Sequence, residues 1–187
     1  MTIRYVVYLF ILGISLFSIT LSQESPLTKL RQEHNVTSII LDKKGIPTVI
    51  EGDLTPKGVQ SDEKEKTYKF FEENRELFTM VDPRNELQIA RINKDELGMT
   101  HVRLNQLYKG IKVYGSELIT HFSSSGKLKS INGGFLPGMN ISHTPRIGDA
   151  EAERIALSDI SSNFKSAKPE VTGTQLIIYP FQETIDL

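Results

Sequence analysis

The chain has 187 residues, of which 39% are hydrophobic and 24% are charged, and its formal net charge at pH 7 is -1. Enough apolar side chains are present for a packed core, which argues against a wholly disordered chain. The near-neutral charge provides no basic field to attract phosphates, so we expect no nucleic-acid partner. The absence of cysteine excludes disulfide bracing and cysteine ligands to a metal.

The first 22 residues have the pattern of a secretory signal peptide. Arg4 supplies a positive start, residues 5–19 are mostly apolar, and small residues lead to Ser22. We expect cleavage after Ser22, secretion to the extracellular space and only transient contact with the membrane; loss of Arg4 brings the charge to about -2. The alternative is an uncleaved anchor, because residues 5–21 approach the lower length limit for crossing a bilayer.

Two strands and one helix are predicted next along the chain. Residues 23–36 are polar with scattered leucines and are either a short helix or a mobile lead-in. Residues 38–41 and 47–50 are predicted strands separated by a glycine-containing turn. A helix is predicted from Ser61 to about Phe78, because its aromatic residues recur near helical spacing and Asp62 lies in the first turn, where it complements the helix dipole.

The segment from Asp95 to Gly134 has the clearest strand pattern, and a further strand at 87–92 leads into it. Tight turns are predicted at Lys109–Gly110 and at 123–126, where glycine tolerates positive φ. A bulge or kink is predicted at Tyr114–Gly115. In the strand that follows Gly98, alternate residues form the more apolar face, which we assign to the core: Thr100, Val102, Leu104, Gln106 and Tyr108.

These elements predict an α+β fold, in which an antiparallel meander packs against the helix at 61–78. A second unit is predicted to contain a helix from Asp149 to about Ile160, capped by Asp149, and a strand from Gln175 to Phe181. One helix and one strand cannot bury a core alone, so this unit is either truncated or packed on the first domain. The expected organisation is a signal peptide, a first domain and an incomplete second domain, at residues 1–22, 23–137 and 138–187.

No catalytic, cofactor-binding or metal-binding residue is predicted. A zinc peptidase requires the spacing His-Glu-x-x-His, and none of the four histidines has it. His101 and His121 lie on strands that are candidates for neighbours, so a shared metal is one interpretation. We favour histidines hydrogen-bonded locally without a metal, because no cysteine and no clear third ligand accompany them.

The segment from Asp95 to Gly134 resembles the fungalysin/thermolysin propeptide domain of secreted zinc metalloproteases of the thermolysin (bacillolysin) family. Residues 42–54 and 61–78 resemble the opening hairpin and the helix of that domain. Residues 147–160 and 175–180 resemble the start of a cystatin-like PepSY domain, although Gly148 replaces the usual Ser or Thr cap and leaves capping to Asp149. The residues that carry the central resemblance are Gly98, His101, Arg103, Tyr108, Gly110, Val113, Gly115, Asn132 and Gly133.

The resemblance implies a propeptide that acts as an intramolecular chaperone and inhibitor of a protease. The implied partner is a cognate zinc metalloprotease catalytic domain, in cis or in trans, and zinc and calcium are expected only in that domain, which this chain lacks. Arg103 and Tyr114 are the candidate residues for contact with the protease. The alternatives are a stand-alone secreted inhibitor or chaperone acting in trans, and a PepSY-like binding module with no protease partner.

Overall fold

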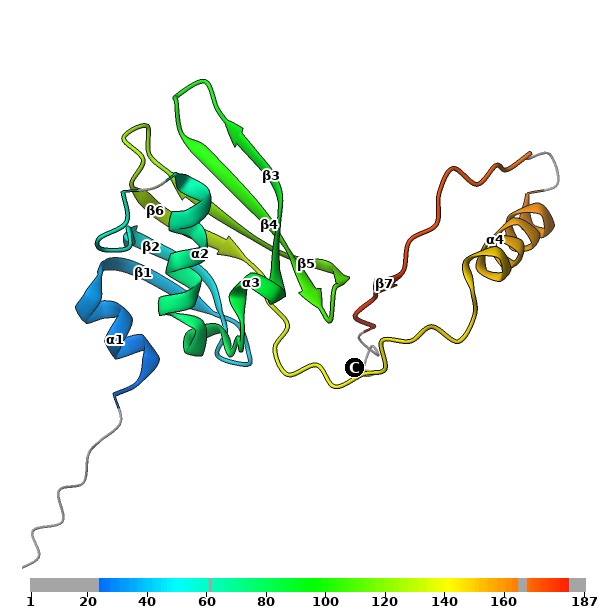
Figure 1. The fold of residues 1–187 in the computed structure, drawn as a ribbon, viewed down its shortest axis with the longest axis horizontal. Helices are drawn as coiled ribbons and strands as arrows, with labels where there is room; N and C mark the ends of the chain where they lie inside the picture. Colours follow the sequence, from blue (N-terminus) through cyan, green and yellow to red (C-terminus); the bar gives the residue numbers. More distant parts are fainter. Residues whose placement is uncertain (1–23, 61, 165–167, 182–187) are drawn as a thin grey trace, which may run out of the picture.

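A computed structural model describes residues 24–60, 62–164 and 168–181 of the chain. Its main body is a twisted sheet covered on one face by helices, and a longer helix and an extended segment follow it in the chain (Figure 1). The predicted signal peptide, with its cleavage after Ser22, lies outside the described residues. None of the helices that the structure describes is both long enough and apolar enough to cross a bilayer.

The described strands form one seven-stranded sheet. Six strands pair antiparallel in the order β1-β2-β6-β5-β4-β3, and β7 pairs in parallel with β5. The predicted meander is therefore confirmed as the continuous run β3-β4-β5-β6. The strand bounds are β1 Asn35–Leu41, β2 Pro47–Asp53, β3 Leu87–Lys94, β4 Thr100–Tyr108, β5 Ile111–Phe122, β6 Leu128–Gly133 and β7 Ile177–Ile178.

The helices lie on one face of the sheet or follow the sheet in the chain. Helix α2 crosses the covered face, and α1 lies beside β1 (Figure 1). The α+β fold class, with the meander packed against a helix, is therefore confirmed. The helix bounds are α1 Pro26–Glu33, α2 Glu63–Glu73, the 3-10 helix η1 Arg75–Phe78, α3 Pro83–Glu86 and α4 Asp149–Asn163.

The hydrophobic core lies between α2 and the sheet. Phe70 and Phe71 of α2 are fully buried, and the ring of Phe71 meets that of Phe78 edge to face at a centroid distance of 5.2 Å. A buried hydrogen bond of 2.8 Å joins the hydroxyls of Thr67 on α2 and Thr120 on β5. The Thr67 hydroxyl also donates to the carbonyl oxygen of Glu63 at 2.8 Å, so it accepts from Thr120, and the contact fixes the helix on the sheet without leaving a buried hydroxyl unpaired.

The prediction of one continuous helix from Ser61 to Phe78 is wrong in one respect. Asn74 ends α2, because its backbone N–H and its side-chain amide both donate to the carbonyl oxygen of Phe70, at 3.1 and 2.9 Å. A short 3-10 helix then places Leu77 and Phe78 in the core. At the other end, Asp62 is the N-cap, and its Oδ1 accepts from the N–H of Glu65 at 3.0 Å.

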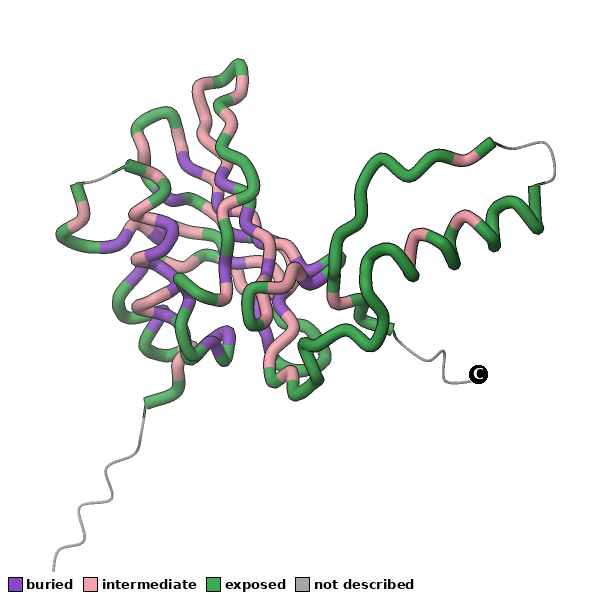
Figure 2. Tube along the Cα trace, turned by 45° about the vertical axis from the view of Figure 1, so that its right-hand side comes forward, coloured by how far each residue is buried: buried purple, intermediate pink, exposed green. Residues whose placement is uncertain are grey.

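The C-terminal elements differ from the prediction in two details. Gly148, not Asp149, occupies the N-cap position of α4, and no side chain caps it, because Asp149 is already the first helical residue. The predicted strand from Gln175 to Phe181 is reduced to Ile177–Ile178, which pairs with Lys112 and Val113 of β5. No described residue after Phe135 is buried, as the green tube of Figure 2 shows. The domain boundary at residue 137 stays a prediction.

Candidate functional site

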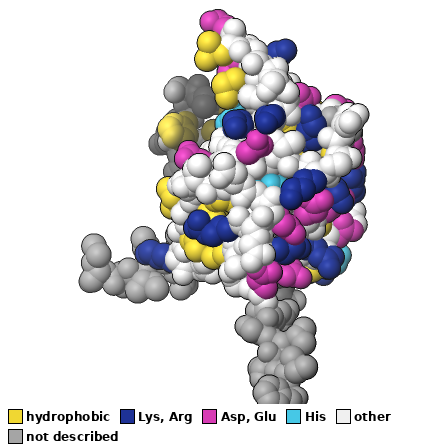
Figure 3. Space-filling view, turned by 90° about the vertical axis from the view of Figure 1, so that its left-hand side faces the viewer, with side chains coloured by type: hydrophobic (Ala, Val, Ile, Leu, Met, Phe, Trp, Pro, Cys, Tyr) yellow, Lys and Arg dark blue, Asp and Glu magenta, His cyan; other side chains and the backbone are white. Residues whose placement is uncertain are grey.

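The face of the sheet opposite α2 is the candidate surface for a partner. On β4, Val102, Leu104 and Gln106 are buried, whereas Arg103 between them is exposed. The predicted alternation of inner and outer residues is therefore confirmed for this strand. Figure 3 draws the side of the molecule that lies at the left of Figure 1. On that side, Lys and Arg are interspersed with Asp and Glu, without a large patch of one sign.

Arg103 projects from the middle of this outer face. Its Nη1 lies 2.5 Å from Oε2 of Glu117 on β5, and Nζ of Lys112 lies 3.8 Å from Oε1 of the same glutamate. The Glu117 side chain is therefore shared by two cations and orients the guanidinium along the sheet. An oriented, exposed arginine with free N–H groups is suited to binding a carboxylate or carbonyl group of a partner.

Tyr114 lies at the predicted bulge in β5. Between the pairs Asn105–Glu117 and Leu107–Lys112, one residue of β4 faces four residues of β5, which confirms the bulge. Gly115 has a φ of 75°, a value that favours glycine. Tyr114 is 55% exposed, and its ring lies 5.4 Å from that of Tyr179, measured between ring centroids.

The edge of β5 beside the bulge is not free. Next to Tyr114, the candidate contact residue at the bulge, Lys112 and Val113 are paired with β7 of the same chain. Tyr114 therefore stands beside an occupied edge and contacts Tyr179, while Arg103 lies further along the sheet on β4. The two candidate contact residues lie on neighbouring strands but have different surroundings, so a partner must span both strands to touch them together.

A buried glutamine that sequence reasoning placed in the core, without assigning it a role, organises the end of the meander. The side-chain amide of Gln106 donates to the carbonyl oxygen of Leu136 at 2.7 Å, and its oxygen accepts from the Leu136 N–H at 2.8 Å. This pair of bonds ties the chain that leaves β6 to the inner side of β4. The sequence feature that could have indicated this role is the polar residue at an inward-facing strand position, because a buried side-chain amide requires hydrogen-bond partners.

His101 and His121 are brought together, as their places on neighbouring strands suggested. Their Nδ1 atoms are 2.7 Å apart, and Nε2 of His101 lies 3.1 Å from Oδ2 of Asp95. Nε2 of His121 lies 2.5 Å from Oδ1 of Asn132 on β6. The hydrogen bond from His101 lowers the pKa of Asp95 below its usual value, with help from the backbone N–H of Met99.

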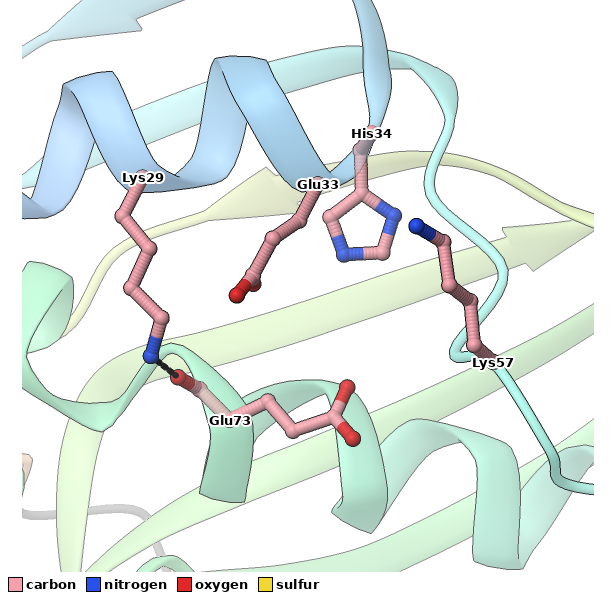
Figure 4. A pocket seen from close by; sticks show the side chains of 5 residues that line it. All are labelled: Lys29, Glu33, His34, Lys57 and Glu73. Carbon is pink, nitrogen blue, oxygen red and sulfur yellow. Dashed lines mark hydrogen bonds between the residues drawn. The ribbon is translucent and has the colours of Figure 1, made fainter.

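A hollow lies between α1 and α2 and contains His34 (Figure 4). Burial lowers the pKa of His34, because the charged imidazolium loses its hydration. Its ring packs against Phe70 at a centroid distance of 5.8 Å. Two lysines and two glutamates complete the lining, so their charges cancel and the hollow selects no ligand of one sign; they are Lys29, Glu33, Lys57 and Glu73.

Comparison with known proteins relates this fold to protease propeptides. Residues 85–135, which span β3 to β6, match the Fungalysin/Thermolysin Propeptide Motif. A thermolysin of Alicyclobacillus acidocaldarius subsp. acidocaldarius is 32% identical over 145 residues, covering 74% of this chain and 26% of that protein. The thermostable neutral protease NprT of Geobacillus stearothermophilus is 30% identical over 151 residues, covering 75% of this chain and 27% of that protein.

The predicted resemblance to the pro-region of a thermolysin-family protease is therefore confirmed. A bacillolysin of Brevibacillus brevis is also similar, with 28% identity over 112 residues, or 56% of this chain and 21% of that protein. The chain spans about a quarter of the length of these relatives. The matched motif ends at residue 135, so the PepSY-like part of the resemblance stays a prediction.

Proposed function

We propose that this chain is the pro-region of a secreted zinc metalloendopeptidase and acts as a chaperone and inhibitor of its catalytic domain, in cis or in trans. The observation that carries the proposal is the coincidence of the β3–β6 meander with the propeptide motif. In this role the chain contributes a folded surface and no reactive groups. Zinc and calcium are then ligands of the catalytic domain.

The physical basis of such a role is selective binding to the native-like protease. A partner that binds the folded form and not the unfolded form lowers the free energy of the folded form by mass action. A high unfolding barrier then preserves the mature enzyme after the pro-region has been removed. A broad, cross-paired sheet is suited to this task because it presents a surface that changes little on binding.

Arg103 and Tyr114 are the residues that we propose to contact the protease. Arginine and tyrosine are both enriched among residues that dominate binding energy at protein interfaces. Arg103 is oriented by Glu117, and Tyr114 is held against Tyr179, so each loses little conformational freedom when a partner binds.

The test is a refolding assay with a purified thermolysin-type catalytic domain that has been denatured. We expect the chain to raise the recovered caseinolytic activity, and excess chain to inhibit the refolded enzyme. Arg103→Ala and Tyr114→Ala should each reduce the recovery, whereas Lys43→Ala, in the exposed turn between β1 and β2, is the control. Unchanged recovery with both variants would refute the contact residues, and no effect of the wild-type chain would refute the function.

Two other functions can be separated from this one by simple mixing. A stand-alone inhibitor should form a tight complex with a mature protease that has folded without it. A PepSY-like binding module should form no complex with any protease of this type. Zinc-dependent hydrolysis of casein by the purified chain alone would overturn all three.

The proposed secretion has its own test, because the signal peptide lies outside the described residues. We expect the chain expressed in a secreting bacterial host to accumulate in the medium, with Gln23 as its first residue. Intact-mass measurement of the exported chain gives that residue directly. Retention in the membrane fraction with Met1 still attached would support the uncleaved anchor instead.

A further inference from the structure

The two histidines on the outer face of the sheet are arranged in an unusual way. His101 on β4 and His121 on β5 are direct cross-strand partners, and their rings meet edge to face with centroids 4.9 Å apart. The contact between the rings is made by the two Nδ1 atoms, at 2.7 Å. The outer nitrogen of each ring faces an oxygen atom, supplied by Asp95 for one ring and by Asn132 for the other.

Counting protons shows what this arrangement requires. The carboxylate of Asp95 only accepts hydrogen bonds, and with the side-chain oxygen of Asn132 turned toward His121, both Nε2 atoms carry protons. A neutral imidazole protonated at Nε2 has a lone pair on Nδ1. Two lone pairs then point at each other across 2.7 Å, and this repulsion is relieved either by a positive centre between the two nitrogens or by a turn of the Asn132 amide that moves the His121 proton to Nδ1.

The same arrangement is the one that proteins use to prepare histidines as metal ligands. A ligating histidine typically donates its other N–H to a carboxylate or carbonyl oxygen, which sets the tautomer and aims the ring. Asp95 and Asn132 hold their histidines in this way, and from different elements: the turn before β4, and β6. The sequence alone led us to favour histidines without a metal; the facing Nδ1 atoms change that interpretation.

We propose that His101 and His121 bind one divalent transition-metal ion of the zinc or copper class through their Nδ1 atoms. No group of three or more His, Cys, Asp and Glu suited to a metal occurs among the residues that the structure describes, so water completes the coordination. Zinc–nitrogen distances of about 2.0–2.1 Å require the two nitrogens to separate to about 3.3 Å. The rings can rotate apart that far, since the side chain of His101 is 23% exposed.

The bound ion would connect four segments of the motif. It joins β4 to β5 directly, and it reaches the turn before β4 and β6 through the hydrogen bonds of Asp95 and Asn132. Because the unfolded chain does not hold the two histidines together, the ion stabilises the folded state. Imidazole nitrogen favours copper and zinc over magnesium and calcium, which prefer oxygen ligands.

The experiment is a calorimetric titration of the full exported chain with zinc sulfate, followed by copper sulfate and magnesium sulfate. We expect one zinc ion per chain, tighter binding of copper, and no binding of magnesium. At a zinc concentration about tenfold above Kd, the Tm should rise by roughly 3–6 °C. Long-range proton–nitrogen NMR spectra should show the zinc-dependent changes on Nδ1 of His101 and His121.

Three variants make the test specific to this pair. His121→Gln should abolish zinc binding, and His143→Gln, at an exposed position after β6, should leave it unchanged. Asn132→Ala should weaken binding by about 10–100-fold, because His121 loses the acceptor that sets its tautomer. Asn132 is exposed, so this variant remains informative even if His121→Gln fails to fold.

Two results would overturn the metal site. One is the absence of zinc and copper binding to the wild-type chain, in which case a shared proton occupies the space between the nitrogens. The other is equal zinc affinity in wild type and Asn132→Ala together with NMR changes confined to His34 or His143. Neither result bears on the proposed chaperone role, since the titration is made without a protease.

Discussion

Helices α2 and α4 have similar sequence signals but opposite environments. Helix α2 has 11 residues and buries four side chains, whereas α4 has 15 residues and buries none. Both contain apolar residues near helical spacing, and both have acidic residues in the first turn. The difference lies in the sheet: α2 packs on a sheet with six antiparallel strands, and the only described strand that follows α4 has two residues. An amphipathic pattern therefore predicts a helix, but burial requires a complementary surface.

This contrast predicts where the stability of the described chain resides. Among the residues that the structure describes, those that are buried all precede residue 136, and they connect α1, α2 and the sheet (Figure 2). Apolar side chains beyond that point remain in contact with water, so their removal changes little of the buried apolar surface. Substitutions of the same residue type before and after residue 136 therefore measure directly how much each part of the chain contributes to the free energy of unfolding.

The largest contrast is expected for phenylalanine. Phe122 on β5 is fully buried, and Phe164 after α4 is 64% exposed. Phe122→Ala should lower the free energy of unfolding by about 3–5 kcal/mol, because it removes apolar contacts and leaves a cavity. Phe164→Ala should change it by less than about 0.5 kcal/mol. Urea denaturation monitored by circular dichroism measures both, and similar losses in the two variants would contradict the boundary.

Alanine substitutions at two adjacent glycines at the end of β6 should differ almost as much in their effect on the free energy of unfolding as the two phenylalanine substitutions do. Gly133 has a φ of 131°, and a Cβ placed there would lie 2.0 Å from the carbonyl oxygen of Glu117. Gly134 has open space at the corresponding position. Gly133→Ala should therefore lower the free energy of unfolding by about 2–4 kcal/mol, through backbone strain and displacement of β5.

The control for that prediction is Gly134→Ala, which should have a free energy of unfolding close to that of the wild type. Thermal denaturation of the two variants under one buffer condition gives the comparison. If Gly134→Ala is destabilised as strongly as Gly133→Ala, the close approach of β5 and β6 is not the cause.

The two hydrogen bonds between Gln106 and Leu136 should contribute less to the free energy of unfolding than the apolar core does. Gln106→Met keeps the volume of the side chain but leaves the N–H and carbonyl of Leu136 without these partners. We expect a loss of about 1–3 kcal/mol in the free energy of unfolding. Gln175→Met, at an exposed position beyond α4, should have no measurable effect. Faster amide exchange at Leu136 in Gln106→Met would locate the change.

The smallest expected effect is the pH dependence due to His34. Its pKa is lowered in the folded state, so at acidic pH the unfolded state binds the additional proton more readily. Stability due to this group is fully present above the unfolded pKa of about 6.5 and is lost as pH falls through the lowered folded pKa. Denaturation measured between pH 7.5 and 5 gives the free energy of unfolding at each pH. We expect this free energy to fall less steeply toward acidic pH in His34→Gln than in the wild type.

The exposed His143 provides the matched control for this last measurement. In His143→Gln, the free energy of unfolding should fall toward acidic pH as it does in the wild type, because the His143 side chain is exposed to solvent in the folded state. A His34→Gln variant with an unchanged pH profile would mean that protons taken up elsewhere dominate the acid sensitivity.

Much of the candidate surface was predictable because strand alternation is a local property. The outward position of Arg103 follows from the apolar residues on either side of it, and the turn at Lys109–Gly110 follows from the glycine. The contact between Tyr114 and Tyr179 was not predictable, because 64 residues of chain lie between the two tyrosines. The hydrogen bonds of Gln106 to Leu136 depend in the same way on where the chain runs after β6.

The amino-acid sequence by itself determined the order of the elements, the tight turns and the inward face of β4, since these depend on φ preferences and on side-chain periodicity over a few residues. The tertiary structure decided which faces are covered, and it alone placed the Nδ1 atoms of His101 and His121 against each other. That contact depends on the register of β4 against β5, which the hairpin turn and the bulge set together. A shift of one residue would point one of the two histidines to the opposite face.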